Sequence, residues 1–395
     1  MLAPEAQPHH RRAAAFGFSA ALVSSIGQTF YIGLFGVSVQ TDLRLEASQW
    51  GALYALATLS SGFLMFWLGG LADRLAMRQA ITVALSVLGL GALLMAIASG
   101  PALLLTGLFC LRLGGQGLTG HMAIVAATRH ARRRGRSIAT AAFGFIVGEA
   151  LLPISVIAML GWLDWRWAWV CAALLVLGVA LPALRMIAAP LPAVVTGTGL
   201  QEEPLRLRRR HLVRKPAFLA ALAVVLVSPF VVTAVFLHQG TLSMLHGWTA
   251  AQIAWGFLAF AMTQAASTWL VGHWIDRHGV RPVFRVYLLP VAIAALALGF
   301  GPSHLALWIL FIGLGATAGG NSVVSGALWA EVFGVDSLGM VRGVYTGFMV
   351  IATAVSPLMF GLSLEADTSV AYLAAGVAAY VVVVPWLAAR GLART

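Results

Sequence analysis

Two ionisable side chains of opposite charge interrupt apolar stretches of the sequence. Arg112 lies in the apolar run 101–128, and Glu149 lies in the run 137–161. If these runs cross a membrane, each charge costs at least ~2.5–3.5 kcal/mol and should face a cavity or a partner. A guanidinium can bind a carboxylate or another anion bidentately, and a carboxyl group balanced between burial and a nearby arginine can carry a proton. The alternative is a fixed ion pair between the two that braces neighbouring helices.

Polar side chains in other apolar runs are candidates for a substrate path. Gln116 is the fourth residue after Arg112 and should share its helix face. His238 can change charge near neutral pH. The alternative for these residues is hydrogen bonding between helices. The candidate substrate-binding residues are Arg112, Gln116, Gln28, Tyr31, Asn321 and His238, with Glu149 as the candidate for proton coupling.

The composition predicts an all-α membrane protein. Hydrophobic residues make up 60% of the 395 residues and charged residues only 10%, whereas soluble domains carry about 25% charged residues. The mean hydropathy is +0.91. A membrane helix needs ~20 apolar residues, and the sequence offers twelve such runs. They lie near 13–40, 47–71, 79–99, 101–128, 137–161, 165–188, 217–244, 249–275, 283–301, 303–330, 338–363 and 368–390.

The net charge of +12 is concentrated in alternate loops, such as 129–136 and 206–215. This distribution follows the positive-inside rule. It predicts a multi-pass protein of the cell inner membrane with both termini in the cytoplasm, and it argues against nucleic-acid binding. The segment 189–216 combines proline, glycine and a dense basic run. We expect it to be a cytoplasmic linker between two six-helix bundles, residues 1–188 and 217–395.

Two loop sequences are nearly the same and lie about half a chain apart. The first is Gly69–Arg78 and the second is Gly272–Arg281, and each keeps glycine, Asp-Arg and arginine at matching positions after an apolar run. An internal repeat in a hydrophobic chain indicates two homologous helical halves, as in many secondary transporters.

These motifs resemble the signature of the major facilitator superfamily over nearly the full chain. The first loop is similar to the pattern G-x-L-A-D-R-x-G-R-R/K, with Ala76 and Met77 as departures, and the run Arg112–Gly117 is similar to the R-x-x-Q/G-G pattern of helix four. The resemblance implies twelve transmembrane helices in two pseudo-symmetric six-helix bundles. It also implies a substrate held between them near the midplane, with transport by alternating access.

The resemblance further implies a latch at the cytoplasmic face that holds the outward-facing state. Gly69 and Gly272 would let helices approach closely. Asp73 and Asp276 would lie just past a helix end and accept N–H bonds from the start of an adjacent helix. The alternative is a set of solvated loop charges that only sets topology. The expected latch comprises Gly69, Asp73, Arg74, Arg78, Gly272, Asp276, Arg277, Arg281, Glu331 and Arg342.

The expected function is secondary active transport of a small organic anion, coupled to protons as in a symporter. One alternative is an exporter of amphipathic or cationic drugs, although Glu149 replaces the proline of the helix-five pattern G-x-x-x-G-P of many exporters. Another is a non-transporting membrane sensor on the same fold. No ATP-binding loop, metal-binding set or nucleophile elbow occurs. We therefore expect no enzyme activity, no catalytic residues, no metal and no cofactor. The expected partners are the substrate, protons and the lipid bilayer, and the expected state is a monomer.

Overall fold

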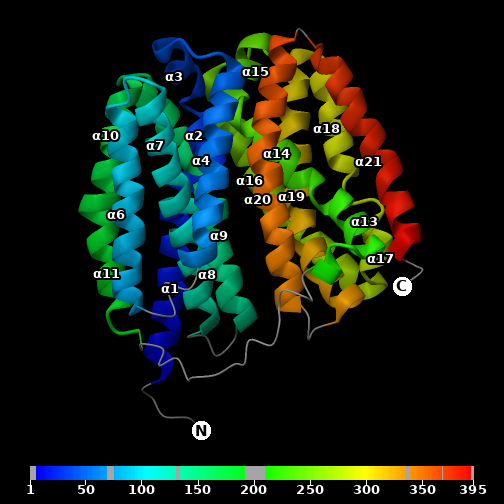
Figure 1. The fold of residues 1–395 in the computed structure, drawn as a ribbon, viewed down its shortest axis with the longest axis horizontal. Coiled ribbons are helices and arrows are strands. Elements are labelled where there is room, and N and C mark those ends of the chain that lie inside the picture. Colours follow the sequence, from blue (N-terminus) through cyan, green and yellow to red (C-terminus); the bar gives the residue numbers. More distant parts are fainter. Residues whose placement is uncertain are drawn as a thin grey trace. The chain divides into compact units, whose positions relative to one another are not determined.

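The computed structural model describes residues 6–68, 75–129, 134–191, 210–334, 338–366 and 368–392, and these are helical or lie in turns and short connections, without strands. Figure 1 shows the helices as long rods that run alongside one another within each half. The chain divides into two compact units, residues 1–198 and 199–395. The expected linker 189–216 lies mostly outside the described residues.

The described residues of the first unit form six long helical stretches, of which three are interrupted. The first stretch is α1, η1 and α2, the fourth is α7, η2 and α8, and the sixth is α10, η3 and α11; η2 and η3 are π-helical. The bounds are α1 Ala6–Ser24, η1 Ser25–Gly27, α2 Thr29–Gly33, α3 Gly36–Leu43, α4 Ala47–Leu68, α6 Met77–Ala96, α7 Pro101–Leu111, η2 Arg112–Thr119, α8 Gly120–Arg129, α9 Arg134–Leu160, α10 Trp165–Leu174, η3 Leu175–Ala180 and α11 Leu181–Ala188.

In the second unit, the part of the chain that the structure describes also forms six long stretches. Its first is divided into α13, α14 and α15, and its third into α17 and α18. The bounds are α13 Pro216–Val225, α14 Val227–Leu237, α15 Gln239–His246, α16 Ala250–His278, α17 Val280–Phe284, α18 Leu289–Phe300, α19 Ser303–Phe333, α20 Leu338–Glu365 and α21 Val370–Leu392.

The helices have the length and composition of membrane spans. Within the described residues, ten stretches are long and apolar enough to cross a membrane. Helices α4 and α16 are not among these ten but have 22 and 29 residues, which corresponds to roughly 33 and 43 Å at 1.5 Å per residue. They coincide with the expected runs 47–71 and 249–275. The all-helical membrane fold is therefore confirmed.

Small residues set the spacing of helices inside each unit. A Cβ atom on Gly144 of α9 would lie 2.3 Å from the Phe18 carbonyl oxygen of α1. In the second unit, a Cβ atom on Gly319 of α19 would lie 2.2 Å from the Gln264 carbonyl oxygen of α16. Backbones that approach so closely leave room only for glycine, as is common in membrane helix pairs.

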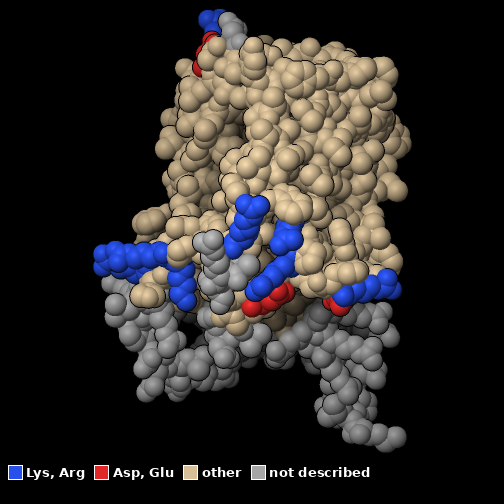
Figure 2. Space-filling view, turned by 90° about the vertical axis from the view of Figure 1, so that its right-hand side faces the viewer, with Lys and Arg blue, Asp and Glu red and all other residues tan. Residues whose placement is uncertain are grey.

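Large apolar side chains lie on the outside of the helices, as lipid contact requires. Trp67, Trp269, Ile293, Met359 and Trp386 are all exposed. Figure 2 shows Lys and Arg side chains near one end of the visible face, with a wide band free of charged side chains above them. Such a band suits the hydrocarbon layer, where charge is expensive.

Candidate functional site

The first span is broken next to its candidate residues Gln28 and Tyr31. Helix α1 ends at Ser24, η1 makes one turn, and Gln28 is extended with φ −92° and ψ 159° before α2 begins. A Cβ atom on Gly27 would lie 2.2 Å from the carbonyl oxygen of Leu111. The break therefore lets the fourth span approach the first closely. Broken membrane helices occur where the backbone is buried in protein or lines a cavity.

The Arg112 side chain connects this helix break to α4 through hydrogen bonds. Its side chain is only 3% exposed. Its Nε donates to the Thr58 hydroxyl at 3.1 Å, and its Nη1 donates to the Gly27 carbonyl oxygen at 3.3 Å. The guanidinium carbon lies 5.1 Å from the centre of the Tyr54 ring, within the range of a cation–π contact. The positive charge is thus held by neutral groups.

Gln116 and Arg112 differ in exposure. Arg112 is buried whereas Gln116 is exposed. Both residues lie in the π-helical segment η2, which spans Arg112–Thr119 and has i→i+5 hydrogen bonds.

Glu149 is a buried acid without a counter-ion. It is 9% exposed, and its Oε2 atom has no hydrogen-bond partner within the described residues. The ion pairs within the described part of the chain join Arg166 to Asp42 and Arg281 to Glu331. The alternative of a fixed Arg112–Glu149 ion pair is therefore wrong for this structure.

Arg112 and Glu149 nonetheless approach the same short turn. Gly27 of η1 contacts Leu111, the residue before Arg112. A Cβ atom on Gly148, the residue before Glu149, would lie 2.3 Å from the Ser25 hydroxyl oxygen of η1. The three-residue turn η1 thus packs against the fourth span through Gly27 and against α9 through Ser25. A buried cation and a buried acid flank one helix break.

The two candidates of the first span differ in exposure. Gln28 is partly exposed, so its amide is available to a solute. Tyr31 is 5% exposed, and its ring packs 5.5 Å from Phe35 and 5.4 Å from Trp169, centre to centre. The structure gives Tyr31 a packing contact between α2 and α10.

In the second unit, His238 links two helices at a break. It lies between α14 and α15, is 1% exposed, and its Nε2 is 2.9 Å from the carbonyl oxygen of Pro357 in α20. Its Nδ1 has no partner within the described residues, and neither does the buried Ser356 hydroxyl. The histidine thus bonds across helices and keeps one free ring nitrogen.

Asn321 belongs to a hydrogen-bonded group that local sequence patterns do not reveal. Its Oδ1 accepts a hydrogen bond from the Tyr287 hydroxyl at 3.0 Å, and its side chain also bonds to Tyr345. Tyr287 follows α17, Asn321 lies in α19 and Tyr345 lies in α20. Three helices of the second unit meet at this amide.

The second loop repeat differs from the expected latch in two respects. A Cβ atom on Gly272 would meet only Val323, at 3.8 Å, which is ordinary van der Waals distance. Close helix approach at Gly272 is therefore wrong. Asp276 does not follow the helix end, because α16 continues to His278, and its side chain is exposed. The carboxylate that accepts from the next helix is Glu331, which receives the Val280 N–H at 3.3 Å.

In the second unit, one ion pair joins two residues of the expected latch. The Nε of Arg281 lies 3.4 Å from Oε1 of Glu331, and the side chains are 50% and 41% exposed. Arg277 and Arg342 are exposed and take part in no ion pair within the described residues. In the first unit, Arg78 is exposed in the first turn of α6. The remaining members, Gly69, Asp73 and Arg74, lie outside the described residues.

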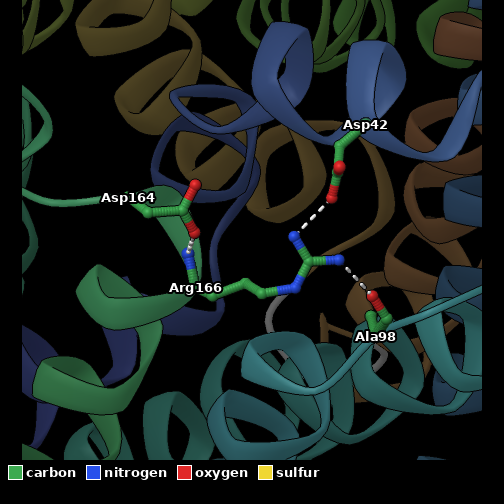
Figure 3. Close-up of polar contacts among 4 residues, drawn as sticks. All are labelled: Asp42, Ala98, Asp164 and Arg166. Carbon is green, nitrogen blue, oxygen red and sulfur yellow. Dashed lines mark hydrogen bonds and ion pairs between the residues drawn. The ribbon is translucent and has the colours of Figure 1, made fainter.

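The first unit contains an ion pair that the sequence did not reveal, at the start of α10. Figure 3 shows the guanidinium of Arg166 between the carboxylate of Asp42 and the carbonyl oxygen of Ala98, with the second contact at 2.8 Å. The Arg166 N–H donates to Asp164, which caps α10. The sequence separation of these residues leaves no local signal for the pairing.

Two compact units, each with six apolar helical stretches among its described residues and with buried polar groups at helix breaks, define a multi-pass membrane protein. A family model for the Major Facilitator Superfamily matches residues 17–246 and 230–394. The chain belongs to this superfamily, and it is a membrane transporter rather than an enzyme.

Solved structures of two other transporters share the fold. A mutant form of the nucleoside transporter NupG gives a TM-score of 0.74 at 11% identity, covering 97% of this chain and 99% of that chain. A bacterial homologue of the human lysosomal transporter Spinster gives 0.65 at 15% identity, covering 100% and 95%. No curated sequence relative matches the chain. At these identities the similarity shows the fold alone.

Proposed function

We propose that this transporter moves a small organic anion together with protons by alternating access. The observation that carries the proposal is the burial of Arg112 with neutral partners. A guanidinium has five N–H donors, and the hydrogen bonds to Thr58 and Gly27 use two of them. The uncompensated charge and the remaining donors favour a carboxylate or a similar anion.

Glu149 is the proposed proton carrier. Its carboxyl group is buried and has one oxygen atom without a partner, and it flanks the same turn as Arg112. When Glu149 is protonated, the arginine charge stands alone and an anion binds more strongly. When Glu149 is ionised, its charge opposes that of the anion. Anion and proton binding therefore favour each other, and this coupling is reciprocal.

Polar side chains of both units complete the proposed substrate set. Gln28 and Gln116 offer amides that are partly or fully exposed. His238 and Asn321 are buried at helix junctions of the second unit. We assign them to substrate contact or to the helix movements that follow binding, with His238 keeping one ring nitrogen free.

The first experiment finds the substrate class. Purified protein is screened by thermal shift against carboxylates, nucleosides, sugars, amino acids and cationic drugs, because a ligand that binds the folded state raises Tm. We expect stabilisation by small organic anions. Stabilisation by cations alone would contradict the anion proposal.

The second experiment tests coupling in proteoliposomes with the anion found in the screen. Uptake should rise when the outside is more acidic and should collapse in Arg112→Ala. In Glu149→Gln, exchange of labelled for unlabelled anion should persist while uptake driven by the pH gradient is lost. Glu46→Gln, at an exposed acid, is the matched control and should behave like the parent. A gradient response in Glu149→Gln would remove Glu149 as the carrier.

Glu149, which forms no ion pair among the described residues, also supports a second candidate, export of amphipathic or cationic compounds. A buried carboxylate is a ready partner for a cation. Resistance profiling separates the two. Cells that express the chain should then survive cationic drugs better than cells with Glu149→Gln, and organic anions should fail to stabilise the purified protein.

We place the protein in the inner membrane with both termini in the cytoplasm, because basic residues gather in the loops on that side. Reporter fusions at the C-terminus test this. A cytoplasmic fluorescent protein should be active there, and an enzyme that requires export should be inactive.

A further inference from the structure

A cavity of about 630 Å³ lies in the first unit where α6 begins and α11 ends. Arg78 in the first turn of α6 and Arg185 in the last turn of α11 line it. Apolar side chains of the sixth span, among them Leu177, Leu181 and Met186, supply the rest of the wall. The lining of the cavity therefore combines two cationic side chains with apolar ones.

The two arginines lack an acidic partner among the described residues. The described acids of the first unit are Asp42, Glu46, Glu149 and Asp164. Asp42 pairs with Arg166 at the start of α10, and Asp164 caps that same helix end. Since α10, η3 and α11 form one continuous span, Trp165–Ala188, Arg185 lies at the opposite end from these acids. Two like charges in one cavity favour an anion between them.

Both arginines lie at one membrane boundary. Arg78 is the second residue of the span Met77–Ala96, and Arg185 lies in the last turn of Trp165–Ala188. By the positive-inside rule this boundary is the cytoplasmic one. Anionic lipid is abundant in that leaflet, and basic pockets between membrane helices there bind acidic headgroups.

The apolar wall is shaped by an irregular helix. The π-helical segment η3, Leu175–Ala180, precedes α11, and π-turns are frequent at functional sites. Leu177 is packed against α6, since a Cβ atom on Gly89 would lie 2.4 Å from Leu177. Met186 is 76% exposed. A ligand that covers these side chains must carry hydrocarbon.

We propose that this cavity binds one anionic phospholipid, with the phosphate between Arg78 and Arg185 and an acyl chain along Leu177 and Leu181. A free inorganic anion would use the arginines but leave the apolar wall uncovered. A zwitterionic lipid would cover the wall but bring its own cation to the arginines. The two arginines together with the apolar lining therefore favour a lipid with net negative charge.

The test compares lipids with identical acyl chains on the purified full-length protein. Native mass spectrometry measures the binding of phosphatidylglycerol, phosphatidylcholine and inorganic phosphate to the parent, Arg78→Gln, Arg185→Gln and the double variant. Arg390→Gln is the matched control, because Arg390 is an exposed arginine in the last turn of α21 in the other unit. The double lysine variant, Arg78→Lys with Arg185→Lys, tests rescue by charge.

We expect the parent to prefer phosphatidylglycerol. Each glutamine substitution should weaken that lipid about fivefold, which corresponds to about 1 kcal/mol per basic residue. The double lysine variant should recover most of the affinity, and Arg390→Gln should bind like the parent. Equal binding of the two lipids, or unchanged affinity in the double glutamine variant, overturns the proposal. Displacement of the lipid by millimolar phosphate would instead assign the cavity to a soluble anion.

Discussion

The Nη1 atom of Arg112 donates a hydrogen bond to the carbonyl oxygen of Gly27 at 3.3 Å. This contact joins the one buried arginine of the described fourth span to the backbone break of the first span. The same guanidinium bonds to Thr58 of α4. Three spans therefore depend on a single side chain, and its removal should affect both stability and transport.

Replacing Arg112 by alanine should lower Tm and abolish transport. The Gly27 carbonyl and the Thr58 hydroxyl would lose their donor, and an unsatisfied buried polar group costs about 1–3 kcal/mol. Arg112→Lys keeps the charge, but its single ammonium lacks the fork that bonds both partners, so intermediate Tm and activity are expected. Thermal unfolding in detergent and proteoliposome uptake measure the two effects.

Thr58→Val is the control that separates structure from transport. It removes one acceptor of Arg112 at nearly constant volume and leaves the guanidinium in place. We expect a modest fall in Tm with transport retained. If Thr58→Val abolished transport as fully as Arg112→Ala, Arg112 would act by bracing helices rather than by contact with an anion.

Substituting Gly27 by alanine should be strongly destabilising. The added Cβ would lie 2.2 Å from the Leu111 carbonyl oxygen and 2.8 Å from Cα of Gly115. Both atoms are backbone, so the first and fourth spans must separate, and overpacking typically costs about 1–3 kcal/mol. A falling Tm measures the effect.

Gly326 in α19 provides the opposite case, because a Cβ atom added there has nothing within 4 Å. Alanine is the better helix former by about 0.5–1 kcal/mol, so Gly326→Ala should keep or raise Tm. Equal destabilisation by the two substitutions would mean that the close contact at Gly27 is not rigid.

Neutralising Glu331 should cost little stability, and the cost should depend on salt. Arg281 and Glu331 are about half exposed, and exposed ion pairs contribute about 0.2–1 kcal/mol. Glu331→Gln should therefore lower Tm slightly in dilute buffer, with a smaller difference at 1 M salt, where the Debye length is about 3 Å. Differential scanning fluorimetry at two salt concentrations checks this.

Asp276→Asn tests whether Glu331, rather than Asp276, is the carboxylate that accepts a hydrogen bond from the next helix. Asp276 is exposed in the last turn of α16 and takes part in no ion pair within the described chain. We expect its Tm to equal that of the parent at both salt concentrations. A larger fall in Tm in Asp276→Asn than in Glu331→Gln would show that Asp276 is the residue that stabilises this helix junction.

Acidification should destabilise the protein through His246. Burial lowers the pKa of His246 below the ordinary value for histidine, and its ring stacks on Trp248 with 4.7 Å between centres. The unfolded chain then binds this proton at a higher pH than the folded chain. The stabilising contribution is present above about pH 6.5, the ordinary histidine value, and is lost as the pH falls below it.

His246→Gln should flatten this part of the pH dependence. The Tm difference between pH 7.5 and pH 5.5 should be smaller in the variant than in the parent. His278→Gln, at an exposed histidine in the last turn of α16, is the control and should keep the parental slope. An unchanged slope in His246→Gln would assign the acid sensitivity to other groups.

The helical architecture was predictable because its causes are local. Long apolar runs and the repeated loop require only composition and spacing, and the described helices fall on those runs. Burial of Arg112 and Glu149 was also predictable, because an ionisable side chain within a membrane span is expected to face the protein interior or a cavity rather than lipid. These features depend on neighbours in the sequence.

The partners of these residues were not predictable, because they come from distant parts of the chain. Thr58 and Gly27 are 54 and 85 positions from Arg112, and no periodic pattern connects them. The exposure of Gln116 was not predictable either, because its position relative to the buried Arg112 depends on how the neighbouring spans pack. Asp276 was misplaced because α16 extends one turn beyond its apolar run.

The π-helical segment η2 has a consequence for how the fourth span tolerates change in length. A π turn already accommodates an additional residue compared with an α turn, so removing one residue between Arg112 and Thr119 can restore regular α geometry without shifting both flanking helices. Deletions elsewhere in α7 or α8 would rotate every later side chain to a new face. A single-residue deletion scan should therefore find one permissive window in this span, at the site of its buried arginine.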